Sequence, residues 1–158
     1  MIVKATSKDS LALAKMAIKI WSEHSLDELA KEFEETIDCE ESAIFMLMVD
    51  NQAVGFAQCQ LRHDYVEGTD SSPVGYLEGI FLEQEFRHRG HAKKLLAQCE
   101  EWAKNKGCTE FAINGVSTVP AFGRGLTLIK FEKNGNILFN QCFDIYNNTT
   151  ENIDSFIS

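Results

Sequence analysis

Long apolar runs are absent from this 158-residue sequence. No stretch approaches the ~20 apolar residues that a membrane-spanning helix needs. The first residues, Met1-Ile2-Val3-Lys4, also lack the apolar region of a signal peptide. We therefore expect no contact with a membrane and a cytoplasmic location.

Metal-binding and redox patterns are also missing. The cysteines are never spaced as C-x-x-C, and most of them fall within apolar periodicity, which is typical of reduced core thiols; they are Cys39, Cys59, Cys99, Cys108 and Cys142. The four histidines are scattered without ligand spacing. The sequence thus predicts no metal site and no disulfide.

Positive charge is in short supply. The sequence has 15 lysines and arginines against 24 aspartates and glutamates, a formal net charge of -9. This balance argues against nucleic acid and anionic membranes as partners, since both require a basic surface. It favours a cationic partner.

The remaining features fit one globular domain over residues 1–158. Hydrophobic residues make up 44% of the chain, enough for a full core, and there are no internal repeats and no linker-like segment. We expect an α/β domain with a mixed, mostly antiparallel sheet flanked by helices.

The first half of the chain predicts a strand, two helices and a hairpin. A strand over 2–5 precedes a capping box, Thr6 to Asp9, and a helix with Leu11, Ala14, Ile18 and Trp21 on one stripe. A second helix begins at Ser25, with Glu28 completing its capping box, and its stripe is Leu26, Leu29, Phe33 and Ile37. The hairpin follows over 43–49 and 53–61, with its turn at 50–52.

The second half is regular only at first. A polar loop over 62–73 leads to an apolar strand over 74–82, and a helix follows in which the apolar positions are Ala92, Leu95, Leu96, Cys99, Trp102 and Ala103. We then expect a strand over 109–114, a short helix over 126–134 and a strand over 137–146. The polar end, 147–158, is expected to be frayed.

The turn Arg87-His88-Arg89-Gly90-His91-Ala92 lies where the apolar strand gives way to the helix. The first N–H groups of a helix have no internal partners and lie at the positive end of its dipole. Gly90 allows close backbone approach, and Ala92 keeps the first helical turn small. These features favour a diphosphate site, although a basic turn that caps a surface helix would give the same pattern.

This turn and its surroundings resemble a known family. Arg87-x-x-Gly90-x-Ala92 matches the Q/R-x-x-G-x-G/A motif of the GCN5-related N-acetyltransferases. The wider sequence is similar to the aminoglycoside 6'-N-acetyltransferase branch over about residues 1 to 112; the similar segments are Gln58, Leu61 to Thr69, Ser72 to Phe81, Glu100 to Lys104 and Lys106 to Ala112. The resemblance implies the GNAT fold, acetyl-CoA as cofactor, a homodimer, and direct transfer of an acetyl group to the 6'-amine of an aminoglycoside.

Glu78 is the residue we expect to be catalytic. A carboxylate among Tyr76, Leu77, Ile80 and Phe81 must be paired or have a raised pKa, and in the resembling family a glutamate of this strand lies near the substrate amine. Glu78 would then accept a proton from the amine, directly or through water. The alternative is a structural carboxylate bonded to a neighbouring side chain.

The resemblance also implies the residues that bind the cofactor. The backbone of Gly79, Ile80, Phe81 and Leu82 would face the pantetheine arm, which the family binds like an added strand. Gly79 would leave room for the arm. Arg87, His88, Arg89, Gly90, His91 and Ala92 would hold the diphosphate.

Trp21, His24, Tyr65 and Glu67 are the expected acceptor-side residues, because a polyamine sugar requires aromatic faces and carboxylates. For Trp21 the alternative is core packing at a helix end. For the acidic face of the second helix it is simple solvation.

The sequence departs from the family after residue 112. Asn114 stands where an acceptor-site aspartate is usual; it cannot carry charge or act as a base, but we expect it to bind the substrate through a hydrogen bond. Phe131 stands where the superfamily often has a tyrosine that protonates the leaving thiolate. Residues 113–158 are therefore divergent. Two alternatives stay open: an acetyltransferase for another polyamine or a peptide amine, and a non-catalytic acyl-CoA-binding protein.

Overall fold

The structure, a computed structural model, describes residues 1–64, 70–113, 126–128, 141–144 and 149–152. In chain order the elements are β1 (Ile2–Lys4), η1 (Ser7–Asp9), α1 (Ser10–Ala17), α2 (Leu26–Asp38), β2 (Ser42–Val49), β3 (Gln52–Arg62), β4 (Val74–Leu82), η2 (Gln84–Phe86), α3 (His91–Asn105), β5 (Phe111–Ile113), β6 (Leu126–Leu128), β7 (Gln141–Asp144) and β8 (Thr149–Asn152).

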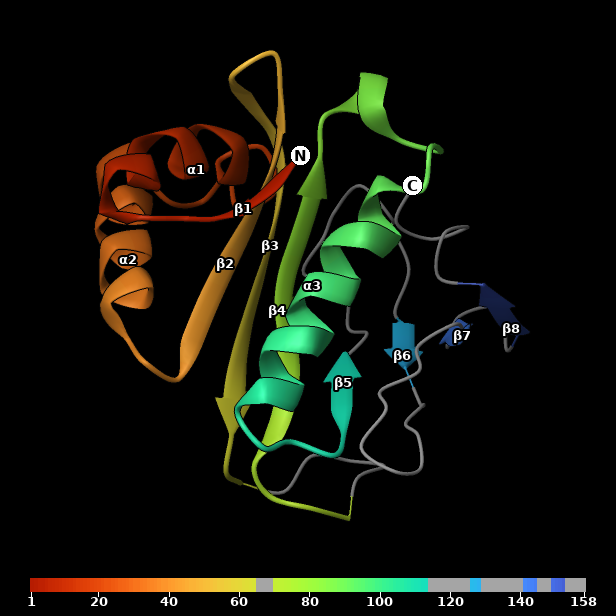
Figure 1. The fold of residues 1–158 in the computed structure, drawn as a ribbon. Helices are drawn as coiled ribbons and strands as arrows, with labels where there is room; N and C mark the ends of the chain where they lie inside the picture. Colours follow the sequence, from red (N-terminus) through yellow and green to blue (C-terminus); the bar gives the residue numbers. More distant parts are fainter. Residues whose placement is uncertain (65–69, 114–125, 129–140, 145–148, 153–158) are drawn as a thin grey trace.

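The first five strands form one mixed sheet in the order β1-β2-β3-β4-β5 (Figure 1). Neighbouring strands are antiparallel from β1 to β4, and only β4 and β5 run parallel. Helix α3 connects the parallel pair, as a crossover between parallel strands requires. This arrangement confirms the predicted fold class: an α/β domain with a mixed, mostly antiparallel sheet flanked by helices.

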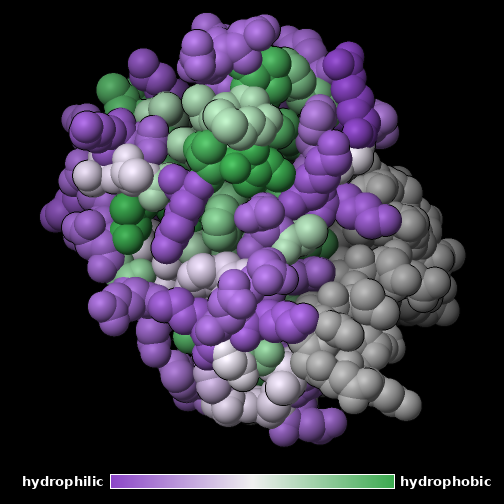
Figure 2. All heavy atoms as spheres, viewed as in Figure 1, coloured by the Kyte–Doolittle hydropathy of each residue, from purple (hydrophilic) through white to green (hydrophobic). Residues whose placement is uncertain are grey.

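Helices cover both faces of this sheet (Figure 1). Helix α3 packs its apolar stripe, including Leu95 and Cys99, on the face that carries Ala57, Cys59 and Leu77. On the other face, α1 and α2 form a second core with β2, β3 and β4, whose members are Ala5, Leu13, Ala14, Met16, Ala17, Ile20, Leu29, Phe33, Ile44, Met46, Phe56 and Phe81. Hydrophilic side chains cover much of the face over which α3 runs (Figure 2).

Local sequence signals account for several boundaries. Ser25 accepts a hydrogen bond from the Glu28 N–H at 3.2 Å, and Glu28 accepts one from the Ser25 N–H at 2.9 Å, which is the predicted capping box of α2. The hairpin turn uses Asp50 and Asn51 with φ of 49° and 62°, a region that both residue types tolerate.

A β-bulge interrupts the pairing of β3 and β4. Gln58 pairs with Gly79, whereas the next residue, Cys59, pairs with Leu77, so Glu78 is the extra residue on β4. Leu77 and Ile80 both join the core under α3, although they are three residues apart. The bulge therefore turns the consecutive residues Glu78 and Gly79 away from that core.

The first helix differs from its prediction. It ends at Ala17, so Ile18 and Trp21 follow it rather than continue it. Leu11, expected on the buried stripe, is 48% exposed, and the buried positions include Leu13 and Ala14. A 3-10 turn, η1, directly precedes α1.

The C-terminal third also differs. Leu126–Leu128 is a strand, not the beginning of a helix, and it pairs with Gln141–Asp144 in a separate three-stranded sheet. Thr149–Asn152 pairs with the same strand, where we expected a frayed end. Leu126–Leu128 pairs with a strand that is distant in sequence, whereas Thr149–Asn152 pairs with the strand that precedes it in the chain. Local polarity and periodicity reveal neither pairing.

No helix among the described residues is long and apolar enough to cross a membrane.

Candidate active site

The turn at 87–92 has the backbone conformation of an anion-binding loop. His88 and Gly90 have φ of 62° and 79°, and Gly90 is the N-cap of α3. No side chain of a described residue caps this helix and its first turn has no acidic residue, whereas α2 has a complete capping box with Asp27 and Glu28 in its first turn. The N-terminus of α3 is therefore open to an external anion.

Hydrogen bonding supports this interpretation. Within the part of the chain that the structure describes, no backbone N–H from His88 to Ala92 donates a hydrogen bond. Arg87 closes the turn, because its Nε donates to the Leu82 carbonyl at 2.9 Å. The residues present fit a diphosphate, which needs several convergent N–H groups and positive charge.

His91 adds an unpaired polar atom at the start of α3. Its Nδ1 is buried without a hydrogen-bond partner among the described residues. Burial, followed by the charges of Lys94 and Arg89, lowers the pKa of His91. His91 thus brings an unpaired ring nitrogen to the N-terminal end of the helix.

The end of β4 leads directly to this turn. On the side of β5, β4 pairs only at Gly75, Tyr76 and Leu77. Beyond them, Gly79–Leu82 have no strand partner on that edge among the residues described. Such an edge can hydrogen-bond an extended ligand in the manner of an added strand.

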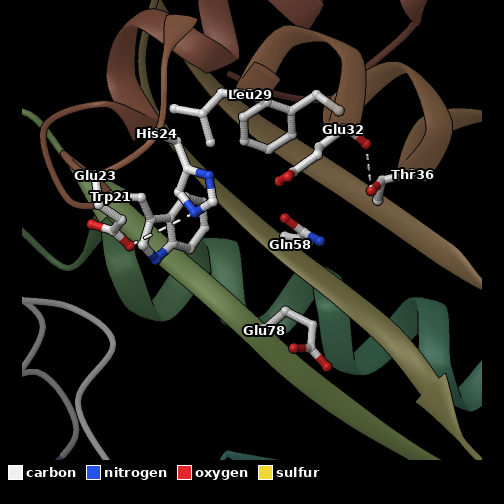
Figure 3. A pocket seen from close by; sticks show the side chains of 9 residues that line it. Trp21, Glu23, His24, Leu29, Glu32, Thr36, Gln58 and Glu78 are labelled. Atoms are coloured by element: carbon white, nitrogen blue, oxygen red, sulfur yellow. Dashed lines mark hydrogen bonds and ion pairs between the residues drawn. The ribbon is translucent and has the colours of Figure 1, made fainter.

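A cavity of about 360 Å³ lies on the face of the sheet that α1 and α2 cover. Glu78 from β4 and Gln58 from β3 lie on its sheet side, and the segment after α1 and helix α2 supply the rest (Figure 3). The full lining is Trp21, Glu23, His24, Leu29, Glu32, Phe33, Thr36, Gln58 and Glu78.

Trp21 belongs both to the core and to the cavity. Its ring lies 6.5 Å from that of Phe33 and 6.3 Å from that of Phe56, centre to centre. The same indole covers Gly79, because a Cβ added there would lie 3.0 Å from two of its ring carbons. The absence of a side chain at Gly79 therefore makes room for Trp21.

Glu78 is paired, which is one of the two states expected of it. The Arg62 Nε and Nη2 donate to its Oε1 at 3.1 Å and 2.8 Å. Its side chain retains 22% of its exposure, so the carboxylate still reaches the cavity.

His24 lies at the mouth of the cavity between two carboxylates. Its Nε2 is 3.7 Å from Glu23 and its Nδ1 is 3.8 Å from Glu28. Both are ion pairs only when the imidazole is protonated. With Glu32 on α2, this cluster makes the cavity acidic.

Of the residues expected at the site, the structure places Glu78, Trp21 and His24 in the lining of one cavity. Tyr65, Glu67, Asn114 and Phe131 lie outside the described residues.

Three residues that sequence reasoning did not assign also belong here: Glu32, Thr36 and Arg62. Glu32 and Thr36 lie three residues after Leu29 and Phe33, at the edge of the predicted stripe. Arg62 shares the period-two alternation of Gln58 and Gln60 at the end of β3. The sequence feature that could have identified these three residues is their polar character at positions that share the period of the neighbouring buried or cavity-facing residues.

Among the described residues, no group of three or more His, Cys, Asp or Glu side chains could hold an ion.

Comparison with known proteins gives consistent matches. Residues 12–121 match the model of the Acetyltransferase (GNAT) family. A curated relative, the aminoglycoside N(6')-acetyltransferase type 1 of Salmonella typhimurium, is 47% identical over 94 residues, which cover 60% of this chain and 65% of the relative. The alignment thus spans just under two thirds of that relative. The enzyme of the same name from Stenotrophomonas maltophilia is 38% identical over 112 residues, 70% of this chain and 72% of the relative.

Solved structures agree. AAC(6')-Iy in complex with the bisubstrate analogue CoA-S-monomethyl-acetylneamine superimposes with a TM-score of 0.69 at 39% identity, covering 72% of this chain and 78% of that one. A complex of AAC(6')-Iy with CoA gives a TM-score of 0.72 at 34% identity, covering 85% of this chain and 94% of the other.

Proposed function

This chain belongs to the acetyltransferase (GNAT) family, and we propose that it is an acetyl-CoA-dependent aminoglycoside 6'-N-acetyltransferase. The observation that carries the proposal is the position of Glu78. It lines an acidic cavity and is followed directly by the edge of β4 that has no strand partner among the described residues and by the turn at 87–92. This position supports a base that would act between a cationic amine in the cavity and CoA bound along that edge.

The cofactor site would use the backbone more than side chains. Acetyl-CoA supplies the acetyl group as a thioester. Gly79, Ile80, Phe81 and Leu82 would bind the pantetheine arm along the free edge of β4. The N–H groups of His88, Arg89, Gly90, His91 and Ala92 would bind the diphosphate, with Arg87 closing the turn.

Glu78 would act as the general base. An ammonium group cannot attack a carbonyl carbon, because its nitrogen has no lone pair until a proton leaves. That proton would pass to the Glu78 carboxylate, directly or through one water, and the neutral amine would then take the acetyl group. Overall, an ammonium and a thioester give an amide, a thiol and one released proton.

The acceptor side suits a polycationic sugar. Trp21 presents an aromatic face, while Glu23 and Glu32 present carboxylates on opposite sides of the cavity. His24 would contact the same ligand. We also assign Tyr65, Glu67 and Asn114 to the acceptor site, on the resemblance to the aminoglycoside branch alone.

Two further properties belong to the proposal. Cys59, Cys99 and Cys108 are free and buried, which suits a reducing compartment such as the cytoplasm. The aminoglycoside branch usually forms dimers through its C-terminal strands, so we propose a homodimer, which sedimentation equilibrium would test.

An acceptor screen tests the function. Release of free thiol from acetyl-CoA is measured with a kanamycin-type aminoglycoside, with spermidine and with a peptide amine. The proposal requires the aminoglycoside to have the highest kcat/KM and mass spectrometry to locate the acetyl group on the 6'-nitrogen. Preference for spermidine or the peptide would move the substrate to another amine class, and CoA binding without thiol release from any amine would overturn enzymatic function.

A further inference from the structure

Arg62 is a second charged residue beside the cavity, and the function proposed above gives it no role. It is the last residue of β3, and two of its N–H groups reach Glu78. Its guanidinium carbon lies 3.6 Å from the centre of the Tyr76 ring. Glu78 thus holds the Arg62 guanidinium at its edge, and the Tyr76 ring packs against its face.

Both hydrogen bonds from Arg62 end on the same oxygen of Glu78. Nε and Nη2 donate to Oε1 at 3.1 Å and 2.8 Å. Oε2 accepts no hydrogen bond from any residue that the structure describes. The carboxylate therefore has one anchored oxygen and one that can meet a ligand.

The charge of the pair matters for an incoming amine. A guanidinium keeps its proton at all relevant pH values, so Arg62 already compensates the charge of Glu78. An ammonium group that reaches Oε2 would share one negative charge with a permanent cation. Nearby positive charge disfavours the protonated form of an amine, whereas an uncompensated carboxylate would hold it as a stable ion pair.

The carboxylates around Glu78 act in the opposite direction to Arg62, whereas His24, when protonated, acts in the same direction. Glu23 and His24 face it from the segment after α1, and Glu32 faces it from α2. The two carboxylates favour a bound ammonium. No lysine or arginine belongs to the described lining of the cavity, so Arg62 is the cation that acts from the sheet.

We infer that Arg62 is a positioning residue that orients Glu78 and promotes loss of the proton from the bound amine. The inference rests on the proposed function. The proton leaves the substrate nitrogen and passes to Oε2 of Glu78, while Arg62 neither gains nor loses one.

Replacement of Arg62 distinguishes an effect on proton loss from the amine from a purely structural role beside Glu78. In Arg62→Met, kcat for a kanamycin-type aminoglycoside should fall about 10-fold, and the pH at half-maximal kcat should rise by about one unit, as loss of a charge at this distance predicts. KM for the amine should not rise, because in Arg62→Met the guanidinium no longer competes with the ammonium for the negative charge of Glu78. Arg62→Lys should restore the pH midpoint but only part of kcat, since it lacks the two-pronged geometry.

Calorimetry provides a readout without turnover. The aminoglycoside is titrated into the CoA-bound protein at pH 7.5 in buffers of different ionisation enthalpy, which gives the number of protons released on binding. Arg62→Met should release fewer protons than the wild type. His24→Asn is the control, because His24 lines the same cavity and pairs with Glu23 only when it is protonated. The effects of His24→Asn and Arg62→Met on proton release should be additive.

The outcomes are distinct. Wild-type transfer to the aminoglycoside, combined with an unchanged pH midpoint and unchanged proton release in Arg62→Met, would overturn the inference and leave the proposed function standing. A wild type that acetylates no aminoglycoside would overturn both. Circular dichroism checks folding, and Arg62→Gln, a neutral planar donor with the same expected result, replaces Arg62→Met if that variant unfolds.

Discussion

The indole of Trp21 occupies the space that a side chain on Gly79 would need. A Cβ at position 79 would lie 3.0 Å from both Cζ2 and Cη2 of Trp21, closer than ordinary van der Waals contact. The bulge at Glu78 causes this, because it turns Glu78 and Gly79 toward the same side of the sheet. Glu78, the proposed base, is therefore linked to Trp21, the aromatic wall of the cavity, through its neighbour Gly79.

Gly79→Ala should displace Trp21 and weaken acceptor binding. We expect KM for the aminoglycoside to rise several-fold, while the Kd for CoA, measured by calorimetry, stays within about twofold, because the clash is on the acceptor side. A Phe ring lacks the two carbons that collide, so adding Trp21→Phe should remove most of the penalty of Gly79→Ala. Additive effects of the two changes would contradict direct contact as the cause.

Two glycines that flank α3 allow a matched test of the turn at 87–92, the proposed diphosphate site. Gly90 and Gly107 have φ of 79° and 91° and open space around the Cβ position, one before the helix and one after it. Alanine at either position should cost roughly 1 kcal/mol of stability, because an L-residue is strained in the left-handed region.

Only Gly90→Ala should also weaken CoA binding, because only Gly90 shapes the turn whose N–H groups would face the diphosphate. The measurements are thermal unfolding and CoA titration. Equal loss of CoA affinity in Gly107→Ala would show that helix stability, not the turn, controls binding. Gly90→Asn should recover part of the stability, since asparagine tolerates this backbone region.

The sequence predicted elements where local signals and burial agree. The hairpin, β4 and α3 combine a clear period with a turn or cap residue, such as Asn51 or Gly90. It failed where strand pairing rather than the local pattern decides the structure: Leu126–Leu128 pairs with a strand distant in sequence, and the polar run Thr149–Asn152 pairs with the preceding strand β7. The bulge was also hidden, since the run Leu77-Glu78-Gly79-Ile80 reads as an ordinary apolar strand, so Arg62 could not be recognised as the partner of Glu78.

Glu78→Gln should reduce kcat by ~10²-fold or more, as removal of a general base typically does. The amide oxygen can still accept the hydrogen bonds of Arg62, so the local fold and the Kd for CoA should be preserved. Glu32→Gln is the matched control, because Glu32 lines the same cavity from α2. It should alter KM more than kcat. Unchanged turnover of Glu78→Gln near neutral pH would assign Glu78 a structural role.

Glu100 should make the protein less stable as the pH rises. Burial raises its pKa from 4.5 to about 8, and it has no hydrogen bond to another described residue. Between these two values the folded state binds more protons at this carboxyl than the unfolded state, so the free energy of unfolding falls as pH increases from about 4.5 to 8. Below pH 4.5 both states are protonated and the penalty is absent.

Glu100→Gln should remove that pH dependence, because an amide does not ionise. We expect the variant to be more stable than the wild type at pH 8 by about 1–2 kcal/mol, reduced from the full linkage value because the side chain is partly exposed. The difference should vanish near pH 4. Urea unfolding at both pH values measures it, and Glu101→Gln, the exposed neighbour, should show no such change. An equal gain at both pH values would mean that packing of the amide, rather than the charge of Glu100, sets the effect.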